Sequence, residues 1–363
     1  LRKSRCRVGG GIRDVDAAIR WLDAGAARVV LGTAARPEVL RDLPRERVIA
    51  ALDARDGEVV VEGWQAGTGE TILDRMDRLR GLVGGFLITF VEREGRMGGT
   101  RLDLVPDLVR AAGDARVTIA GGVTTPEDVA RLDAMGADAQ VGMALYTGRM
   151  ELADAFAAPL RSDRADGLWP TVVVDECGVA LGLAYSSLES LREALRLRRG
   201  VYHSRQRSLW VKGGSSGDVQ DLLRVEVDCD RDALRFVVRQ HGRGFCHRGV
   251  CGCFGDGRAE GLAALQERIA AQAAAATPGS YSARLLGDAE LLNAKLREEA
   301  GELADARTAD EVTREAADVL YFTLVTMRRA GVRLDDVAAE LDRRGLRLTR
   351  RRGDAKPAAG VRP

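Results

Sequence analysis

The sequence predicts a multidomain protein in which a partial (βα)8 barrel is followed by an α+β domain and then by an all-α domain. Three observations lead to this fold class. Short apolar runs alternate with amphipathic stretches over about 155 residues, strand-like patterns rich in cysteine and histidine follow, and helix-forming residues dominate after residue 277. The boundaries that we expect are 1–158, 165–258 and 277–348, with a disordered tail over 349–363.

Composition excludes several classes of function. The 363 residues carry 55 lysines and arginines against 54 aspartates and glutamates, and a net charge of +1 argues against nucleic acid as a partner. No run approaches the ~18 apolar residues of a membrane span, and the first residues lack the apolar core of a signal peptide. We therefore expect a cytoplasmic protein that binds neither nucleic acid nor a membrane.

The barrel prediction rests on alternating strands and helices in the first region. Buried parallel strands are expected at residues 28–31, 47–50, 85–88 and 117–120. Helices are expected at 14–24 and 126–135, because Asp14 and Thr125 are suitable N-caps for them. About six strands can be counted, fewer than the eight of a complete TIM barrel.

An internal repeat adds a candidate ligand site to this barrel. A glycine-containing pattern at residues 10–12 and 31–33 recurs about 111 residues later, close to half the length of a whole barrel. Glycines between a strand and a helix expose backbone N–H groups that can hold a phosphate. We therefore predict a ligand with two phosphates, unless the glycines only form tight turns. The residues expected to bind it are Gly10, Gly11, Gly32, Thr33, Gly121, Gly122 and Gly142.

A metal site is predicted in the middle region. Five of the six cysteines and all three histidines lie between residues 177 and 253, which in a cytosolic chain favours metal binding or catalysis over disulfides. Residues 228–232 continue a strand pattern, so alternation would place Asp228, Asp230 and Asp232 on one face and Cys229 on the other. Carboxylates suit Mg²⁺, whereas thiolates suit Zn²⁺.

Two further cysteines complete the predicted zinc site. With Cys229, the thiolates of Cys246 and Cys253 leave one tetrahedral position open for water, as in a catalytic zinc site, and so indicate a hydrolase. Cys251 could replace Cys253, although we expect it to be a bystander. His247 could be a ligand, a general base or a surface residue, and we favour a base or a substrate contact. The alternative for the whole cluster is ordinary cysteines beside a solvated acidic strand end.

A loop rich in cations, hydroxyls and glycines precedes the cysteines. Such a set can hold a phosphorylated ligand through charge-assisted and backbone hydrogen bonds, although a plain basic loop is the alternative. The side chains expected to contact that ligand are Arg205, Arg207, Lys212, Ser215 and Ser216.

The segment 170–255 resembles phosphoribosyl-AMP cyclohydrolase of histidine biosynthesis. The resemblance lies in the motifs Ser-Arg-x-Arg, Leu-Trp-x-Lys-Gly, Asp-Cys-Asp-x-Asp and Cys-His-x5-Cys-Phe. It implies a zinc- and magnesium-dependent dimer that opens an adenine ring by adding water. The resemblance carries the zinc ligands onto the same three cysteines and the magnesium ligands onto the same three aspartates. Two positions depart from the family, which usually has tryptophan at His203 and often histidine or alanine at Asp218.

Two acidic segments stand out in the helical region. Helices are expected at 291–306, 309–329 and 334–343, and the first two carry carboxylates three residues apart on one face. If these two helices pack antiparallel, four carboxylates converge, and their repulsion requires a cation such as Mg²⁺. The alternative is two solvated helix faces.

This helical region resembles phosphoribosyl-ATP pyrophosphatase, an all-α, MazG-like relative of nucleotide pyrophosphatases. The matching segments are 280–286, 295–303 and 315–321. The resemblance implies that pyrophosphate is released from phosphoribosyl-ATP, and that the phosphoribosyl-AMP product feeds the cyclohydrolase. The expected magnesium ligands are Glu299, Glu302, Glu315 and Asp318.

The first region is similar to the ribotide isomerase that follows in histidine biosynthesis, a (βα)8 barrel with a two-phosphate substrate. The match implies that Asp53 is the general acid and that Thr89 lies near the substrate loop. The first two βα units, with the aspartate that serves as general base, are not in the sequence. We therefore expect a bifunctional hydrolase; a trifunctional enzyme with an active barrel, or a noncatalytic barrel used for scaffolding, are the alternatives.

Overall fold

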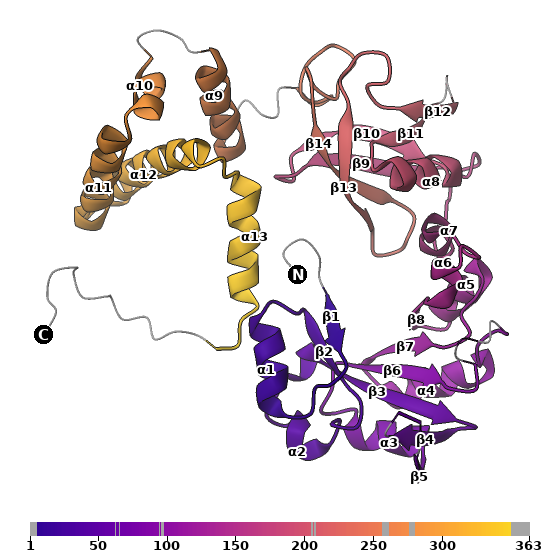
Figure 1. Cartoon of the computed structure of the whole chain (residues 1–363). Coiled ribbons are helices and arrows are strands. Elements are labelled where there is room, and N and C mark those ends of the chain that lie inside the picture. The colour runs from indigo at the N-terminus through magenta and orange to yellow at the C-terminus, as the bar shows by residue number, and fades with distance from the viewer. Residues whose placement is uncertain are drawn as a thin grey trace, which may run out of the picture. The chain divides into compact units, whose positions relative to one another are not determined.

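The computed structural model describes residues 6–61, 63–64, 66–93, 95, 98–204, 206, 208–255, 261–275 and 280–349. The chain divides into two compact units, one formed by Leu1–Pro159 with Glu340–Pro363 and the other by Leu160–Ala339 (Figure 1). In the described part of the chain, no helix has the length and apolar character needed to cross a membrane.

The first unit is built on a parallel sheet. Six strands pair in parallel in the order β1-β2-β3-β6-β7-β8, and the hairpin β4-β5 adds to β3 (Figure 1). The six are β1 (Arg7–Gly9), β2 (Arg28–Leu31), β3 (Val48–Arg55), β6 (Gly85–Phe90), β7 (Arg116–Ala120) and β8 (Ala137–Ala139). The hairpin consists of β4 (Glu58–Val61) and β5 (Ala66–Thr71). The predicted partial barrel is thereby confirmed, because six parallel strands alternate with helices.

Helices cover this sheet and bury one core against it. They are α1 (Val15–Asp23), α2 (Pro37–Leu40), α3 (Ile72–Leu79), α4 (Val105–Ala112), α5 (Pro126–Ala134), α6 (Met143–Tyr146) and α7 (Leu152–Ala157), with short 3-10 turns at Arg45–Arg47 and Leu102–Leu104. Asp14 and Thr125 accept hydrogen bonds from the first turns of α1 and α5, so both predicted caps are confirmed. The core includes Leu31, Phe86 and Ile119 of the strands and Leu22 and Met76 of the helices.

Side chains connect the two ends of the strand order. Arg7 on β1 donates to the Thr118 hydroxyl on β7 at 3.2 Å and forms an ion pair with Asp138 on β8 at 3.7 Å. These contacts require the sheet to curl, because β1 and β8 are the first and last strands of the parallel path. The curvature is that expected of part of a barrel.

A short segment near the end of the chain packs on the same unit. The carboxylate of Asp23 accepts hydrogen bonds from the backbone N–H groups of Leu348 and Thr349, and Arg47 donates to the carbonyl of Leu346. Leu348 also packs against the core. The predicted disordered tail lies outside the described residues, apart from Thr349.

The second unit begins with a mixed sheet in the order β12-β11-β10-β9-β14-β13 (Figure 1). Its strands are β9 (Trp169–Asp175), β10 (Ala180–Ser186), β11 (Val201–Ser204), β12 (Ser208–Val211), β13 (Gln220–Val227) and β14 (Leu234–Gln240), with α8 (Leu188–Leu197) between β10 and β11. Only β9 and β14 pair in parallel among these neighbours. This is the predicted α+β region.

In the described residues after this sheet, five helices follow. They are α9 (Gly261–Ala275), α10 (Tyr281–Gly287), α11 (Ala289–Asp305), α12 (Ala309–Arg329) and α13 (Leu334–Gly345). Their core consists of Ile269, Leu285, Leu292, Phe322, Leu324 and Val325. The three helices predicted at 291–306, 309–329 and 334–343 are α11, α12 and α13.

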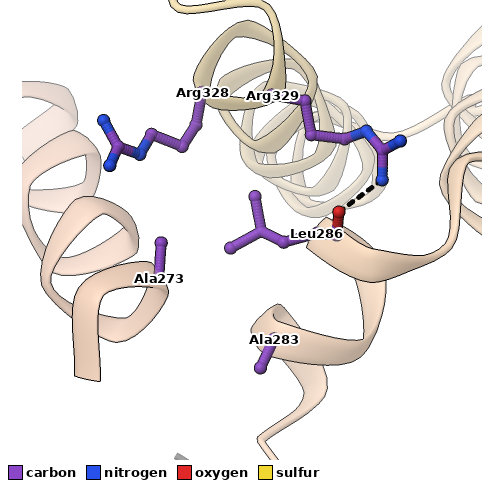
Figure 2. Close-up of a pocket in the computed structure, with 5 residues that line it drawn as sticks. All are labelled: Ala273, Ala283, Leu286, Arg328 and Arg329. Atoms are coloured by element: carbon purple, nitrogen blue, oxygen red, sulfur yellow. Dashed lines mark hydrogen bonds between the residues drawn. The ribbon is translucent and has the colours of Figure 1, made fainter. Parts of the chain in front are cut away.

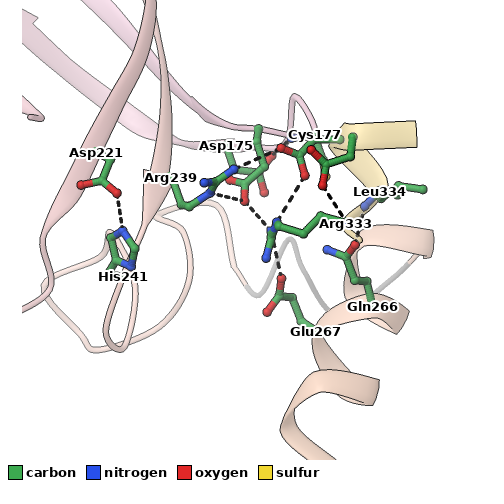
Figure 3. A network of polar contacts seen from close by, with 12 residues as sticks. Asp175, Cys177, Asp221, Arg239, His241, Gln266, Glu267, Arg333 and Leu334 are labelled. Carbon is green, nitrogen blue, oxygen red and sulfur yellow. Dashed lines mark hydrogen bonds and ion pairs between the residues drawn. The ribbon is translucent and has the colours of Figure 1, made fainter. Parts of the chain in front are cut away.

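A network of ion pairs joins the sheet of this unit to its helices (Figure 3). The carboxylate of Glu176, with 5% of its side chain exposed, contacts Arg239 of β14 at 3.3 Å and Arg333 at 2.5 Å. Both arginines also contact Asp335 in the first turn of α13, at 3.1 and 3.2 Å. A nearly buried carboxylate is therefore neutralised by cations from two different parts of the unit.

Candidate functional site

The acidic cluster between α11 and α12 brings together three of the four carboxylates predicted there. Ligand oxygens of Glu299, Glu315 and Asp318 all lie within 4.8 Å of one another. Glu299 is only 7% exposed, so its charge needs a counterion. The helices form because Asp288 and Thr308 cap their first turns, and three-residue spacing then sets Glu315 and Asp318 on one face of α12.

The fourth predicted ligand, Glu302, lies beside this cluster but outside the group of three. Burial raises the pKa of Glu302, and the nearby carboxylates of Glu299 and Glu315 raise it further. Lys295 sits one turn before Glu299 and forms ion pairs with Glu298 at 3.0 Å and with Glu299 at 2.9 Å. These two ion pairs raise the pKa of Lys295. The cluster thus has the donor chemistry of a Mg²⁺ site and one lysine as its internal counterion.

The three aspartates after β13 also converge, although not on a strand. Ligand oxygens of Asp228, Asp230 and Asp232 lie within 4.8 Å of one another, as predicted. The strand prediction for residues 228–232 was wrong, because β13 ends at Val227 and these residues form the bent loop of the β13–β14 hairpin. The carboxylate of Asp228 accepts hydrogen bonds from the N–H groups of Asp232 and Ala233, which closes the loop. Loop closure rather than strand alternation gathers the aspartates.

The predicted zinc ligands are separated within one chain. Cys246 is buried and interacts with Cys253, whose pKa is raised by burial and by the neighbouring Cys246 thiol. Cys229 is exposed in the hairpin loop, and the three sulfur atoms do not form a group within 4.8 Å in the described part of the chain. Two adjacent thiols fit half of a zinc site, and the third predicted ligand does not join them.

Strand order explains this separation. Cys253 lies against β10, because its N–H donates to the Leu181 carbonyl at 2.7 Å and a Cβ at Gly182 would lie 3.2 Å from its sulfur. Cys229 follows β13, the last strand of the order β12-β11-β10-β9-β14-β13. Strands β9 and β14 therefore lie between the two positions, which places them roughly 14 Å apart at ~4.8 Å per strand.

The remaining predicted residues of this domain have mixed placements. Ser215 and Ser216 are exposed in the loop after β12, and His247 is exposed beside Cys246, with its Nδ1 atom 3.9 Å from the Cys246 sulfur. Arg205 and Arg207 lie outside the described residues. Lys212 is 5% exposed, and its ammonium donates to the carbonyls of Asp218 and Gly244 at 3.0 and 3.3 Å. The lysine is therefore engaged with backbone carbonyls.

At the barrel sheet, the predicted residues collect at the carboxyl ends of the strands. Asp53 of β3 is in register with Thr89 of β6. The indole N–H of Trp64 donates to the Asp53 carboxylate at 2.9 Å, a contact that spacing alone does not reveal. Parallel strands end at the same edge, so Asp53 and Thr89 face one edge of the sheet.

The glycines of the repeat occupy that same edge. Gly10, Gly11, Gly32 and Thr33 follow β1 and β2, whereas Gly121, Gly122 and Gly142 follow β7 and β8. Gly10, Gly11, Gly121 and Gly122 have positive φ angles between 69° and 93°, which favour glycine. At Gly122 a Cβ would lie 2.3 Å from the Gly99 carbonyl oxygen, so that position also needs glycine for close approach. The turn interpretation is therefore part of the explanation, and phosphate binding remains a prediction.

An open hollow in the helical region was not predicted (Figure 2). It is lined by Ala273, Ala283, Leu286, Arg328 and Arg329 of α9, α10 and α12. Arg329 donates to the carbonyls of Leu285 and Leu286 and so caps the end of α10. The paired arginines at the end of α12 were its only sequence signal.

Comparisons with known proteins follow the same three regions. Residues 2–151 match the family described as histidine biosynthesis protein, residues 182–255 match phosphoribosyl-AMP cyclohydrolase, and residues 262–345 match phosphoribosyl-ATP pyrophosphohydrolase. The three matches follow one another along the chain in this order. The three resemblances predicted from sequence motifs are thereby confirmed.

Relatives share all or part of this arrangement. A histidine biosynthesis trifunctional protein of Neurospora crassa is 37% identical over 95% of this chain and 38% of its own length. A histidine biosynthesis bifunctional protein, his7 of Schizosaccharomyces pombe, is 49% identical over 58% of this chain and 50% of its own length. An imidazole-4-carboxamide isomerase of Halobacterium salinarum is 46% identical over 42% of this chain and 65% of its own length. The chain thus spans half or less of the length of the first two relatives.

Proposed function

We propose that this chain catalyses two successive hydrolytic steps of histidine biosynthesis. The helical domain releases pyrophosphate from phosphoribosyl-ATP, and the mixed-sheet domain then adds water to phosphoribosyl-AMP and opens its adenine ring to give the formimino carboxamide ribotide. The observation that carries the proposal is the succession of the two matching domains, each with a cluster of metal-ligand residues. The proposed domains are those predicted from the sequence, at residues 1–158, 165–258 and 277–348.

In the pyrophosphatase domain we assign Glu299, Glu315 and Asp318 to Mg²⁺, with Glu302 at the edge of the site. When bound, Mg²⁺ would neutralise these carboxylates and polarise a phosphate chain. The four residues hold their positions because both helices are capped and packed on a shared core. Lys295 pairs with Glu299 and reduces the repulsion among these carboxylates.

In the cyclohydrolase domain we assign Cys246 and Cys253 to Zn²⁺ and Asp228, Asp230 and Asp232 to Mg²⁺. When held by thiolates, Zn²⁺ would acidify water at the site. His247 is exposed beside Cys246 and is our candidate general base. Ser215 and Ser216, together with Arg205 and Arg207, are proposed to hold the substrate phosphate, whereas the hydrogen bonds of Lys212 support a role in holding the loop.

The zinc site is completed by a second copy of the chain in this proposal. Cys229 follows the edge strand β13, whereas Cys253 and its neighbour Cys246 lie beside β10, so one chain cannot supply three thiolates to one ion. In a dimer with two-fold symmetry, each Cys229 can reach the partner's cysteine pair, and two equivalent sites form. The homodimer expected from the resemblance would thus be needed for catalysis.

The isomerase-like domain carries candidate catalytic and phosphate-binding residues at the carboxyl edge of its sheet. Asp53 and Thr89 on neighbouring strands support a general acid beside a substrate loop, and the glycine turns support a two-phosphate ligand. Isomerase activity is therefore the second candidate function, and a scaffolding role for this domain is its competitor. The cytoplasmic location and the absence of nucleic-acid and membrane partners stay predictions.

The test is to incubate the purified chain with phosphoribosyl-ATP, Zn²⁺ and Mg²⁺ and to separate the products chromatographically. Release of pyrophosphate with accumulation of the ring-opened aldose would support two activities. Conversion onward to the ketose would add isomerase activity. Failure to release pyrophosphate would overturn the assignment of the helical domain, and phosphoribosyl-AMP that stays intact would overturn that of the mixed sheet.

A further inference from the structure

Two loops of the cyclohydrolase domain meet around one nearly buried carboxylate. The first loop, 212–218, carries the two candidate substrate serines, and the second, 241–253, carries the cysteine pair and His247. Asp218 ends the first loop and is 5% exposed. It occupies a position where the resembling family often has histidine or alanine, so its role must be derived from this chain.

The Asp218 carboxylate binds Arg243 of the second loop through three hydrogen bonds. Its Oδ1 atom accepts hydrogen bonds from the backbone N–H of Arg243 at 2.9 Å and from Nε of the same residue at 3.4 Å. Its Oδ2 atom accepts one from the Nη2 atom of Arg243 at 3.0 Å. The Arg243 guanidinium holds the pKa of Asp218 well below its usual range. A planar guanidinium bound through two nitrogens fixes orientation as well as charge.

Lys212 adds a second connection between the same loops. Its ammonium donates to the Asp218 carbonyl of the first loop and to the Gly244 carbonyl of the second. The loops approach closely at this point, because a Cβ at Gly242 of the second loop would lie 2.5 Å from Oδ1 of Asp218. The first loop is itself closed tightly, because a Cβ at Gly213 would lie 2.4 Å from the Asp218 backbone. The two loops therefore behave as one packed body.

The second loop continues directly into the cysteine turn. The N–H of Phe245 donates to the Cys251 carbonyl at 2.8 Å, and the N–H of Cys246 donates to the Val250 carbonyl at 3.2 Å. Arg243 precedes this turn by two residues. Its position relative to the first loop therefore sets where the Cys246 thiol lies relative to the exposed serines.

We propose that Asp218 and Arg243 form a positioning pair, which holds the cysteine turn in register with the substrate loop and thereby supports both zinc binding and substrate affinity. This inference rests on the proposed cyclohydrolase function. Neither residue is assigned to the substrate or to the metal. The pair acts through the placement of Cys246 and of the serine loop.

The experiment compares Arg243→Ala, Arg243→Lys and Asp218→Asn in the full chain. Arg196→Ala is the matched control, because Arg196 forms an exposed bidentate pair with Glu193 on α8 and belongs to neither loop. Zn²⁺ affinity is measured by competition with a chelator, the ligand field by the Co²⁺ spectrum, and phosphoribosyl-AMP turnover by separate kcat and KM values. Hydrogen exchange of the Phe245 and Cys246 amides is measured in the metal-free protein.

We expect Arg243→Ala to weaken Zn²⁺ binding about tenfold, as loss of a residue supporting metal ligands typically does. It should also change the Co²⁺ spectrum and raise KM more than it lowers kcat. Exchange at the two amides should be about tenfold faster than in the control. Arg243→Lys and Asp218→Asn should lie in between, because each keeps part of the contact.

The inference is overturned if zinc affinity, the Co²⁺ spectrum, KM and amide exchange match those of Arg196→Ala. A lower melting temperature with unchanged zinc affinity and KM would also overturn it, since the pair would then only stabilise the fold. If the wild-type chain neither binds Zn²⁺ nor opens the ring, the proposed function fails. In that case the amide exchange of the metal-free variants still tests whether the positioning pair holds the cysteine turn in place.

Discussion

The helical domain and the mixed-sheet domain assemble their predicted metal ligands in opposite ways. In the helical domain, carboxylates of two adjacent helices converge within one chain. In the mixed sheet, the three predicted cysteines divide between the edge strand β13 and the inner strand β10. Helical spacing repeats every three to four residues and returns side chains to the same face, whereas residues beside strands that are not neighbours in a sheet stay apart by the width of the strands between them.

The difference shows when a single chain can complete a metal site by itself. Glu315 and Asp318 are one turn apart, so that only the packing of α11 is needed to add Glu299. Cys229 follows β13, whereas Cys246 and Cys253 lie beside β10, and strands β9 and β14 separate these positions. We therefore expect the acidic site to depend on one chain and the zinc site to depend on two.

The largest effect should follow from mixing two inactive variants. Cys246→Ser and Cys229→Ser should each abolish ring opening and zinc retention. Coexpressed in equal amounts, they should recover about a quarter of wild-type activity, because half of the dimers are mixed and one of their two sites is intact. The measurement is turnover of phosphoribosyl-AMP with zinc content of the purified dimers. Absence of recovery, with mixed dimers shown by mass, would place all the ligands within one chain.

A second loss should stay confined to the helical domain. Glu299→Gln removes a buried charge from the acidic cluster without changing its shape, and should lower pyrophosphate release by about 10²-fold or more because Mg²⁺ loses a ligand. Ring opening of supplied phosphoribosyl-AMP should be unchanged. Glu290→Gln, in the first turn of the same helix, is the matched control. Retained pyrophosphate release in the Glu299 variant would contradict its assignment.

The sequence predicted those features that depend on local spacing. The limits of α11 and α12, the caps Asp14 and Thr125 and the six parallel strands all follow from patterns within a few residues. Convergence of Asp228, Asp230 and Asp232 was also predicted, although for the wrong reason, because a hydrogen-bonded loop replaced the expected strand.

Features that depend on distant contacts were not predictable in the same way. The separation of Cys229 from Cys246 follows from the order of the strands in the sheet, and the partner of Asp218 is known only once the loop of Arg243 is seen to pack beside it. The indole contact of Trp64 with Asp53 likewise depends on a turn with a positive φ angle at Trp64. Each of these follows from backbone geometry that residue types alone do not specify.

Ion pairs with distant partners should also contribute more to stability than ion pairs with nearby partners. Glu176 and Glu226 provide a matched comparison. Each contacts two arginines, but Glu176 is 5% exposed with a partner 157 residues away, whereas Glu226 is 28% exposed and contacts neighbours in its own hairpin. Glu176→Gln should destabilise the second unit by about 1–3 kcal/mol, because it removes a nearly buried charge from two arginines. Glu226→Gln should cost less than ~1 kcal/mol. Urea unfolding followed in the second unit measures both, and equal losses would mean that burial does not set the strength of these pairs.

Cys177 reports on the same network and has no part in the proposed chemistry, so its prediction bears on neither catalysis nor folding (Figure 3). Partial burial, with the nearby carboxylates of Asp175 and Glu176, raises the pKa of Cys177 to about 11. At pH 8 about one thiol in a thousand would then be ionised, against about one in four for an ordinary cysteine, so iodoacetamide should label it more than ~100-fold slower than a model peptide. The rate should rise about tenfold per pH unit up to pH 10, because only the thiolate reacts, and Glu176→Gln should increase it at pH 8 by removing a negative neighbour. Peptide mapping by mass spectrometry gives the rate at this residue, and labelling as fast as the model peptide would show that the carboxylates do not face the thiol.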